Sequence, residues 1–194
     1  MENTTNDRRV QKTRHALHRA FVELVLARGY EAVTIGAIIE QANVGRSTFY
    51  SHYTSKEDLL EESLTHPCNG LAACVDTAVT VQDLAPLLEH FMQQSSINRI
   101  FFEPPLRSLW VLSLAKRIEP RLPREGRPRP TKQPSLTALL VAETQIALIA
   151  HWLLGRFPLE PPAVAGMLLT NTRALLAAQF PDTRERTSVA LNVG

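Results

Sequence analysis

The sequence predicts an all-α protein, and the spacing of its apolar residues is the main reason. Apolar side chains recur at intervals of three and four residues along most of the 194-residue chain, which is the period of an amphipathic helix. Two long apolar stretches, about 135–154 and 161–180, close the chain. Strand pairs, internal repeats and heptads are not evident in the sequence. We therefore expect roughly nine helices.

Composition and charge limit the class of protein. With 44% hydrophobic and 21% charged residues, the chain has the make-up of a soluble globular protein. A net charge of +2 excludes a strongly basic coat, so any contact with nucleic acid must come from local charge. The two cysteines, Cys68 and Cys74, are too few for a disulfide scaffold. The polar N-terminus lacks a secretory signal, and no uncharged apolar run reaches membrane-span length, so we expect a cytoplasmic protein without a membrane segment.

The first two helices are indicated by their apolar stripes and their caps. The first should span about 7–28 and end at Gly29, a typical C-cap residue. Its apolar stripe contains Leu17, Phe21, Leu24 and Val25. Thr34 can cap a short second helix through its hydroxyl, and Ile35, Ile38 and Ile39 supply the apolar face of that helix.

The segment 34–56 carries the strongest functional pattern. The second helix breaks near Asn43, and another begins at about Gly45, which is the arrangement of a helix-turn-helix whose second helix enters the DNA major groove. Phe49 and Tyr53 fit packing onto the preceding helices, and the neighbouring polar residues are left to face outward. The candidate DNA contacts in this run are Gly45, Arg46, Ser47, Thr48, Tyr50, His52 and Lys56.

Each candidate contact has a chemical reason. Small residues at 45, 47 and 48 allow close approach, and exposed N–H groups at the helix start favour phosphate. Arg46 can donate two hydrogen bonds to a guanine edge, although a phosphate contact or a solvated position fits as well. Tyr50 and His52 can reach the DNA backbone, and His52 could instead cap or pack. Lys56 is a point charge suited to a phosphate.

The rest of the chain is predicted to be helical, with prolines that end, bend or interrupt two of the helices and with one irregular segment. Ser55 should cap a fourth helix, which Pro67 ends or bends. Further helices are expected over 81–94, entered or interrupted at Pro86, and after Pro104. Residues 119–135 are rich in proline and arginine, and we expect a mobile loop there. The helix over about 135–154 is apolar nearly all round and needs more than one packing partner.

The run Gly45-Arg46-Ser47-Thr48-Phe49-Tyr50-Ser51-His52-Tyr53-Thr54-Ser55-Lys56-Glu57-Asp58-Leu59-Leu60 resembles the TetR/AcrR family of bacterial regulators. The resemblance covers about residues 8–64. It implies a homodimer that binds a palindromic operator in double-stranded DNA, usually as a repressor released by a small-molecule effector. It also implies phosphate or base roles for Thr34, Arg46, Thr48, Tyr50, His52 and Lys56. The chain departs from the family pattern at Gly36, at Ile39 and at Pro67.

The resemblance also divides the chain. It implies a three-helix DNA-binding domain over 1–54 and a ligand-binding and dimerisation domain over 55–194. The last two long helices would form a four-helix bundle between two copies, with interface candidates Leu148, Trp152, Leu168 and Leu175. Four aromatic residues could line the effector pocket or simply form the core: Phe91, Phe101, Phe102 and Trp110.

Some of the remaining residues suggest other functions. His66, Cys68 and Cys74 suggest a metal or redox sensor, but their spacing matches no compact zinc pattern. A DNA-binding protein without an effector is a further alternative. No nucleophile–base pairing, Gly-rich phosphate loop or metal spacing is evident, so we expect no enzyme activity, no catalytic residues and no cofactor.

Overall fold

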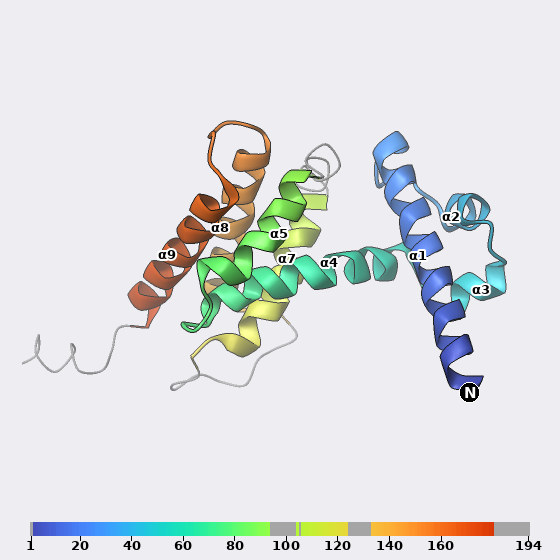
Figure 1. Cartoon of the computed structure of the whole chain (residues 1–194), viewed down its shortest axis with the longest axis horizontal. Coiled ribbons are helices and arrows are strands. Elements are labelled where there is room, and N and C mark those ends of the chain that lie inside the picture. The colour runs from blue at the N-terminus through green and yellow to red at the C-terminus, as the bar shows by residue number, and fades with distance from the viewer. Residues whose placement is uncertain (1, 94–103, 105, 124–132, 181–194) are drawn as a thin grey trace, which may run out of the picture. The chain divides into compact units, whose positions relative to one another are not determined.

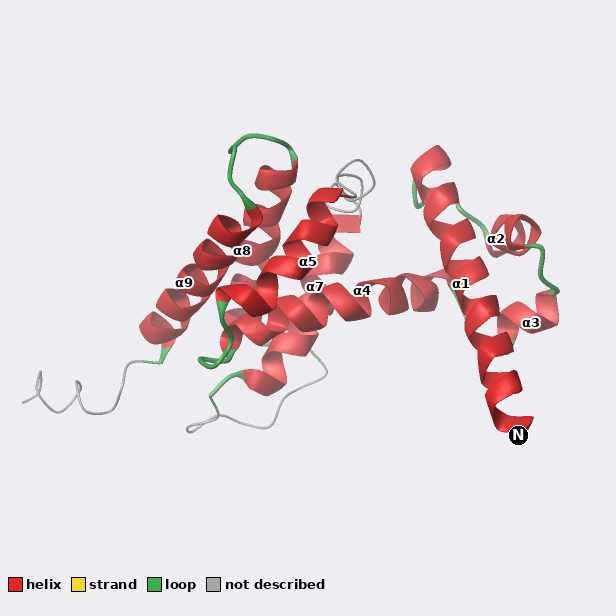
Figure 2. Ribbon diagram, in the orientation of Figure 1, coloured by secondary structure: helices red, strands yellow, loops and turns green. Residues whose placement is uncertain are grey.

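The computed structural model describes residues 2–93, 104, 106–123 and 133–180, with side chains from residue 8 onward. Within these residues it contains eight α-helices and two short 3-10 helices and no strand, which confirms the all-α prediction (Figures 1 and 2). The chain divides into two compact units, residues 1–66 and 67–194. We call the first unit the head.

Helix α1 (Glu2–Arg28) begins earlier than the expected start at about residue 7 and ends where predicted. Gly29 follows with φ +77°, a left-handed conformation that glycine adopts without steric cost, and its N–H donates to the Val25 carbonyl (2.9 Å). The predicted apolar stripe of this helix is buried, with Leu17 and Phe21 completely inaccessible. The stripe packs against α2 (Ile35–Ala42).

The residues that cap the two short helices of the head determine where these helices begin and end. The Thr34 hydroxyl accepts a hydrogen bond from the Ala37 N–H (3.2 Å), so the predicted cap of α2 is confirmed. Asn43 ends α2 in the left-handed conformation, with φ 50° and ψ 51°. After this turn α3 (Arg46–Tyr50) begins, with Gly45 as its N-cap residue. Ile38 of α2 and Phe49 of α3 are both fully buried, which holds the two helices on the core.

Helix α4 (Lys56–Ala72) differs from its prediction at Pro67. Its start agrees, because the Asp58 N–H donates to the Ser55 hydroxyl (3.1 Å). The expectation that Pro67 ends the helix is wrong, since α4 continues to Ala72 and is followed by the 3-10 helix η1 (Ala73–Val75). Cys68 and Leu71 are fully buried beyond the proline, and this burial offsets the lost backbone hydrogen bond.

Gly70 serves a packing role in α4. A Cβ atom at this position would lie 2.8 Å from Leu87 Cδ2 of α5 (Val81–Gln93), closer than two carbons normally approach. The glycine therefore permits close approach of another helix. Helix α5 includes Pro86 without a break, so the expected interruption there is also wrong.

The C-terminal unit is built around α8 (Leu136–Leu153). This helix packs against both α7 (Leu106–Ile118) and α9 (Pro161–Gln179), and α9 also packs against α5 and η1. The expectation of more than one partner for α8 is therefore confirmed. Between α8 and α9, the buried Gln145 amide donates to the buried Thr172 hydroxyl (2.9 Å).

The connection from α7 to α8 is partly regular. Glu119–Arg121 forms the 3-10 helix η2, where we expected only a mobile loop. The Glu119 carboxylate accepts from the Ser135 N–H (2.8 Å) and hydroxyl (2.6 Å), while that hydroxyl caps α8. Residues 124–132 of the expected loop lie outside the described residues.

In the described part of the chain, α8 alone is long and apolar enough to cross a membrane, with 18 residues, a mean hydropathy of 1.5 and half of it buried. The core helix of a globular fold has the same properties. The buried Gln145–Thr172 hydrogen bond and the two packing partners of α8 are features of a core helix.

Candidate nucleic-acid interface

Helix α3 is held by one face and exposes the other. Phe49 and Tyr53 are buried with their ring centroids 5.8 Å apart, so their predicted packing roles are confirmed. Arg46 and Ser47 are exposed, as is the N-cap residue Gly45, while Thr48 and His52 are half-buried. The arrangement therefore presents a short row of polar side chains on a rigidly packed helix.

Tyr50 lies at the end of this row. Its ring contacts Phe49 edge to face, with centroids 5.4 Å apart, yet 48% of the residue is exposed. The contact restrains the ring while leaving much of it accessible. Ser51 ends the helix, and its hydroxyl donates to the Thr48 carbonyl (2.7 Å). Tyr50 is thus an ordered, outward-facing side chain, as a docking contact requires.

Thr34 can act outward while it caps α2. A hydroxyl has one donor and two acceptor positions, and the Ala37 N–H occupies only one acceptor. The O–H of this exposed residue therefore remains able to donate to a phosphate oxygen. Gly36 is exposed beside it, and a Cβ there would meet only the Thr34 hydroxyl, at 3.8 Å.

Lys56 is placed differently from the other candidates. Its ammonium nitrogen donates to the carbonyls of Tyr30 (3.0 Å) and Val33 (3.1 Å), and lies 4.4 Å from the centroid of the Tyr30 ring. The residue is half-buried at the start of α4. Sequence reasoning missed these contacts, because they join residues more than 20 positions apart with no local signal.

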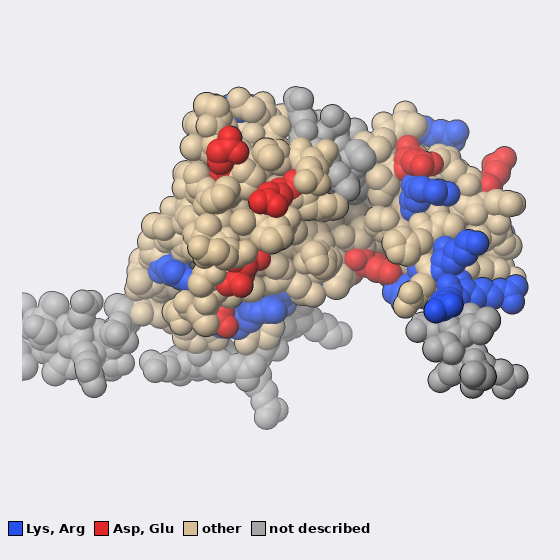
Figure 3. All heavy atoms as spheres, viewed as in Figure 1, with Lys and Arg blue, Asp and Glu red and all other residues tan. Residues whose placement is uncertain are grey.

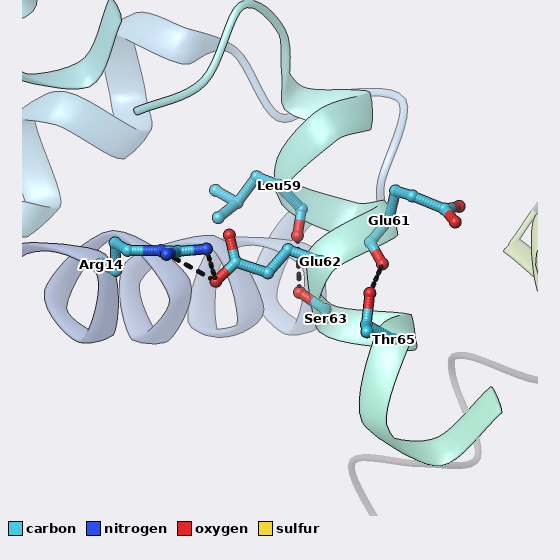
Figure 4. A network of polar contacts seen from close by, with 6 residues as sticks. All are labelled: Arg14, Leu59, Glu61, Glu62, Ser63 and Thr65. Atoms are coloured by element: carbon cyan, nitrogen blue, oxygen red, sulfur yellow. Dashed lines mark hydrogen bonds and ion pairs between the residues drawn. The ribbon is translucent and has the colours of Figure 1, made fainter. Parts of the chain in front are cut away.

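A second missed contact joins the two long helices of the head (Figure 4). Arg14 of α1 holds Glu62 of α4 through two nitrogens, Nη2 at 2.7 Å and Nε at 3.1 Å from the same carboxylate oxygen. Burial alone would raise the pKa of Glu62, but the hydrogen bond and ion pair with Arg14 help to outweigh it and hold that pKa below its ordinary value. Burial raises the pKa of Tyr53 to about 12, and the nearby Glu62 carboxylate adds to the shift.

The basic residues of the head matter through their positions on its surface and not through its net charge. The face drawn in Figure 3 shows more basic surface on the head than on the C-terminal unit. The acidic and basic residues of the head nearly balance in the sequence, so attraction to DNA has to come from their placement. The exposed Arg46 places one such cation on the outward face of α3.

The four aromatic residues suggested for an effector pocket are only partly described. Phe91 and Trp110 are buried and contact each other edge to face, with centroids 6.2 Å apart, as core aromatics do. Phe101 and Phe102 lie outside the described residues.

The four dimer candidates differ in accessibility. Leu168 and Trp152 are buried within the chain, and the Trp152 indole N–H donates to the Leu159 carbonyl (2.8 Å), which leaves little surface for a partner. Leu148 and Leu175 are half-buried. The closing helices instead expose three residues that sequence reasoning missed: Leu136, Leu140 and Met167.

The two cysteines are buried. Burial raises the pKa of the Cys74 thiol to about 12, against the opposing effects of its backbone hydrogen bond and of Arg173. His66 is exposed, and the described residues contain no group of three or more His, Cys, Asp or Glu side chains that could hold a metal. A thiolate-based sensor would need a lower pKa and an accessible sulfur.

Comparison with known proteins finds similarity to transcriptional regulators that contain a helix-turn-helix. The family model for bacterial regulatory proteins of the tetR family matches residues 17–63. An uncharacterized HTH-type transcriptional regulator of Bacillus subtilis, YxbF, is 31% identical over 107 residues, which is 55% of this chain but only 24% of that relative. Another from the same organism, YhgD, is 26% identical over 162 residues, 72% of this chain and 84% of that relative.

Solved structures extend the similarity to most of the chain. The crystal structure of a TetR transcriptional regulator from Streptococcus agalactiae 2603V is 28% identical, with a TM-score of 0.55 over 88% of this chain and 98% of that one. The relatives are named as transcriptional regulators, which is the class of protein that the sequence predicts. The helix-turn-helix segment matches the model of the tetR family of bacterial regulatory proteins, and the fold behind it is similar to that of a TetR transcriptional regulator.

Proposed function

We propose that this protein binds a palindromic operator as a homodimer and represses transcription until a small-molecule effector releases it. The observation that carries the DNA-binding part is the two-sided placement of α3. Phe49 and Tyr53 are buried on the core side, while Arg46, Ser47 and Tyr50 are exposed on the other. A short helix held in this way can enter a major groove without losing its packing.

The proposed contacts divide by chemistry. Arg46 would read a guanine edge, with Ser47 and Thr48 making shorter base or phosphate contacts. Tyr50, His52 and the Thr34 hydroxyl would hold the sugar-phosphate backbone and fix the register. Gly45 would allow the start of α3 to approach closely. Residues 1–54 would form the DNA-binding domain and 55–194 the regulatory domain, in a protein of the cytoplasm.

Effector release would act through α4. This helix begins in the head and ends in the C-terminal unit, so it belongs to both. A bound ligand that favours one position of α4 would change the spacing of the two heads on the operator. It can do so only through different affinities for the two arrangements. A redox trigger is disfavoured, because both cysteines are buried.

The experiment begins by selecting genomic fragments with the purified full chain and sequencing them. We expect an inverted repeat to emerge, and affinity for it to fall steeply with salt. Arg46→Ala and Tyr50→Ala should each weaken binding about tenfold or more, because a specific contact contributes about 1–3 kcal/mol. Arg28→Ala is the matched control, since Arg28 is also exposed but lies at the end of α1.

Two results would contradict the proposal. One is the absence of any enriched duplex in the selection. The other is unchanged affinity when Arg46→Ala and Tyr50→Ala are combined, which would mean that α3 does not face the DNA. An effector that binds the C-terminal unit without changing operator affinity would remove the regulatory part alone.

A further inference from the structure

Residues 8–22 of α1 form a basic segment that lies outside the helix-turn-helix. The segment contains no Asp or Glu, and its cations are Arg8, Arg9, Lys12, Arg14 and Arg19. The first three are exposed, and no carboxylate among the residues with described side chains pairs with them. Cations placed so close together repel one another, and an anion that approaches them relieves this repulsion.

Part of this segment faces the same side of α1 as the helix-turn-helix. Successive intervals of three, seven and four residues define one face of the helix, which carries Arg9, Lys12, Arg19 and Glu23. At the end of this face the Glu23 carboxylate accepts a hydrogen bond from the side-chain amide of Gln41 in α2 (2.7 Å). That contact turns the face towards α2, and Figure 1 shows α2 and α3 on the same side of α1.

Arg9 and Lys12 also lie near α3 along the axis of α1. Arg14 interacts electrostatically with Tyr53, which comes three residues after the end of α3. Because an α-helix rises about 1.5 Å per residue, Lys12 is about 3 Å and Arg9 about 8 Å from Arg14 along the axis. Arg28 is about 21 Å away in the opposite direction. Figure 3 shows basic side chains gathered on the head over α3 and the N-terminal half of α1.

We propose that Arg9 and Lys12 bind backbone phosphates of double-stranded DNA next to the base pairs that α3 contacts. Charge complementarity supports this partner, because both side chains are exposed donors without a carboxylate among the described residues. The proposal rests on the proposed function, since it needs α3 docked on a duplex. It adds a second surface, on α1, that holds the backbone and carries no sequence preference of its own.

The first test measures affinity against salt for the fragment selected by the wild-type chain. Each phosphate contact contributes about 0.9 to the slope of log affinity against log salt. Arg9→Gln combined with Lys12→Gln should therefore make the slope shallower by about 1.8 and weaken binding about tenfold or more at about 0.1 M salt. Arg9→Lys combined with Lys12→Arg keeps both charges and should keep the wild-type slope.

The matched control removes two charges elsewhere. Arg28→Gln combined with Arg156→Gln changes exposed arginines at the far end of α1 and in the loop after α8, and its slope should be that of wild type. All of these variants change exposed side chains, so thermal unfolding should match wild type and show that each protein is folded.

The second test separates a contact from general attraction. The phosphates of the selected fragment are replaced one at a time by neutral methylphosphonates, and each duplex is titrated with wild type and with the Arg9→Gln, Lys12→Gln variant. We expect at least one replacement to weaken wild type severalfold and to leave the variant unchanged, because that contact is already lost. Equal effects of every replacement on both proteins would overturn the proposal.

The remaining outcomes are also decisive. A wild-type salt slope in the Arg9→Gln, Lys12→Gln variant would overturn the role of α1. If Arg46→Ala weakened binding while that variant did not, the proposed function would stand and the second surface alone would fail. If the wild-type chain bound no duplex, the proposed function would fail, and the phosphate contacts of α1 would fail with it.

Discussion

The guanidinium of Arg14 holds one oxygen of the Glu62 carboxylate with two nitrogens, 2.7 Å and 3.1 Å away, and so ties α1 to α4 within the head (Figure 4). Both side chains are more than a third exposed, so solvent screens the pair and its contribution to stability is modest, about 0.2–1 kcal/mol. The carboxylate also faces Tyr53 and His18. The pair therefore gives the head a measurable dependence on pH.

Glu62→Gln should destabilise the head at pH 7 by about 0.5 kcal/mol, and this difference should vanish at low pH. The folded-state pKa of Glu62 lies below 4.5, so the stabilisation is present above pH 4.5 and is lost as pH falls through the folded value. Denaturant unfolding of both proteins at pH 7 and near pH 3 measures this. Glu40→Gln, at an exposed carboxylate of α2, is the control and should show no such convergence. A constant difference across pH would contradict the assignment.

The cysteines should be unreactive in the native protein. Because burial raises the Cys74 pKa to about 12, almost no thiolate is present at pH 8, and Cys68 is fully buried. We expect iodoacetamide at pH 8 to modify neither residue in the folded chain and both in guanidinium chloride, as counted by mass spectrometry. Rapid labelling of native Cys74 would reopen the redox alternative.

Local signals in the sequence were enough to place most helix ends. Thr34, Ser55 and Ser135 each bond an N–H three residues further on, and the side chain alone suggests this role. Pro67 misled because the continuation of α4 depends on the burial of Cys68 and Leu71, which is a tertiary effect. In the same way, Gly70 allows close helix packing that depends on the position of Leu87, another tertiary effect.

In the candidate site too, the features that depend on local sequence could be predicted, and the contacts between distant residues could not. The apolar spacing of Phe49 and Tyr53 predicted their burial, although Tyr53 lies beyond the end of α3, and the burial of Phe49 was sufficient to predict which face of α3 is free. The contacts of Lys56 with residues 30–33, and of Arg14 with Glu62, join positions too far apart for any sequence period to indicate. Leu168, a candidate for the dimer interface, is buried within the chain. The sequence could not indicate this, because an apolar residue that faces the core and one that faces a partner subunit have the same helical spacing.

Pairing of two copies should depend on the exposed apolar residues of the closing helices. Leu140→Arg or Met167→Arg should shift the protein from dimer to monomer in sedimentation experiments, because a buried charge without a partner is costly at an interface. Leu112→Arg is the matched control, since Leu112 of α7 is as exposed as Leu140. A monomeric wild-type protein, or a dimer unaffected by either substitution, would refute this surface.

Trp152→Phe should separate folding from pairing. Loss of the indole N–H leaves the Leu159 carbonyl without that donor, and we expect a destabilisation of about 0.5–1.5 kcal/mol. Because Trp152 is buried within the chain, the oligomeric state at concentrations where the protein is folded should stay that of wild type. A dimer that dissociates in Trp152→Phe while the fold is intact would restore Trp152 as an interface residue.

Two glycines within helices should respond to alanine in opposite directions. Gly36 of α2 is exposed, a Cβ there meets nothing closer than 3.8 Å, and its φ is not left-handed, so Gly36→Ala should stabilise the head by about 0.5–1 kcal/mol through helix propensity. A Cβ at the half-buried Gly70 would lie 2.8 Å from Cδ2 of the buried Leu87, whose side chain would have to shift, and overpacking of this kind costs about 1–3 kcal/mol, which exceeds the same propensity gain. Urea denaturation of the two variants beside wild type measures both changes, and each serves as the control for the other. If Gly70→Ala were as stabilising as Gly36→Ala, then α4 and α5 would not be in close contact at Gly70 in solution.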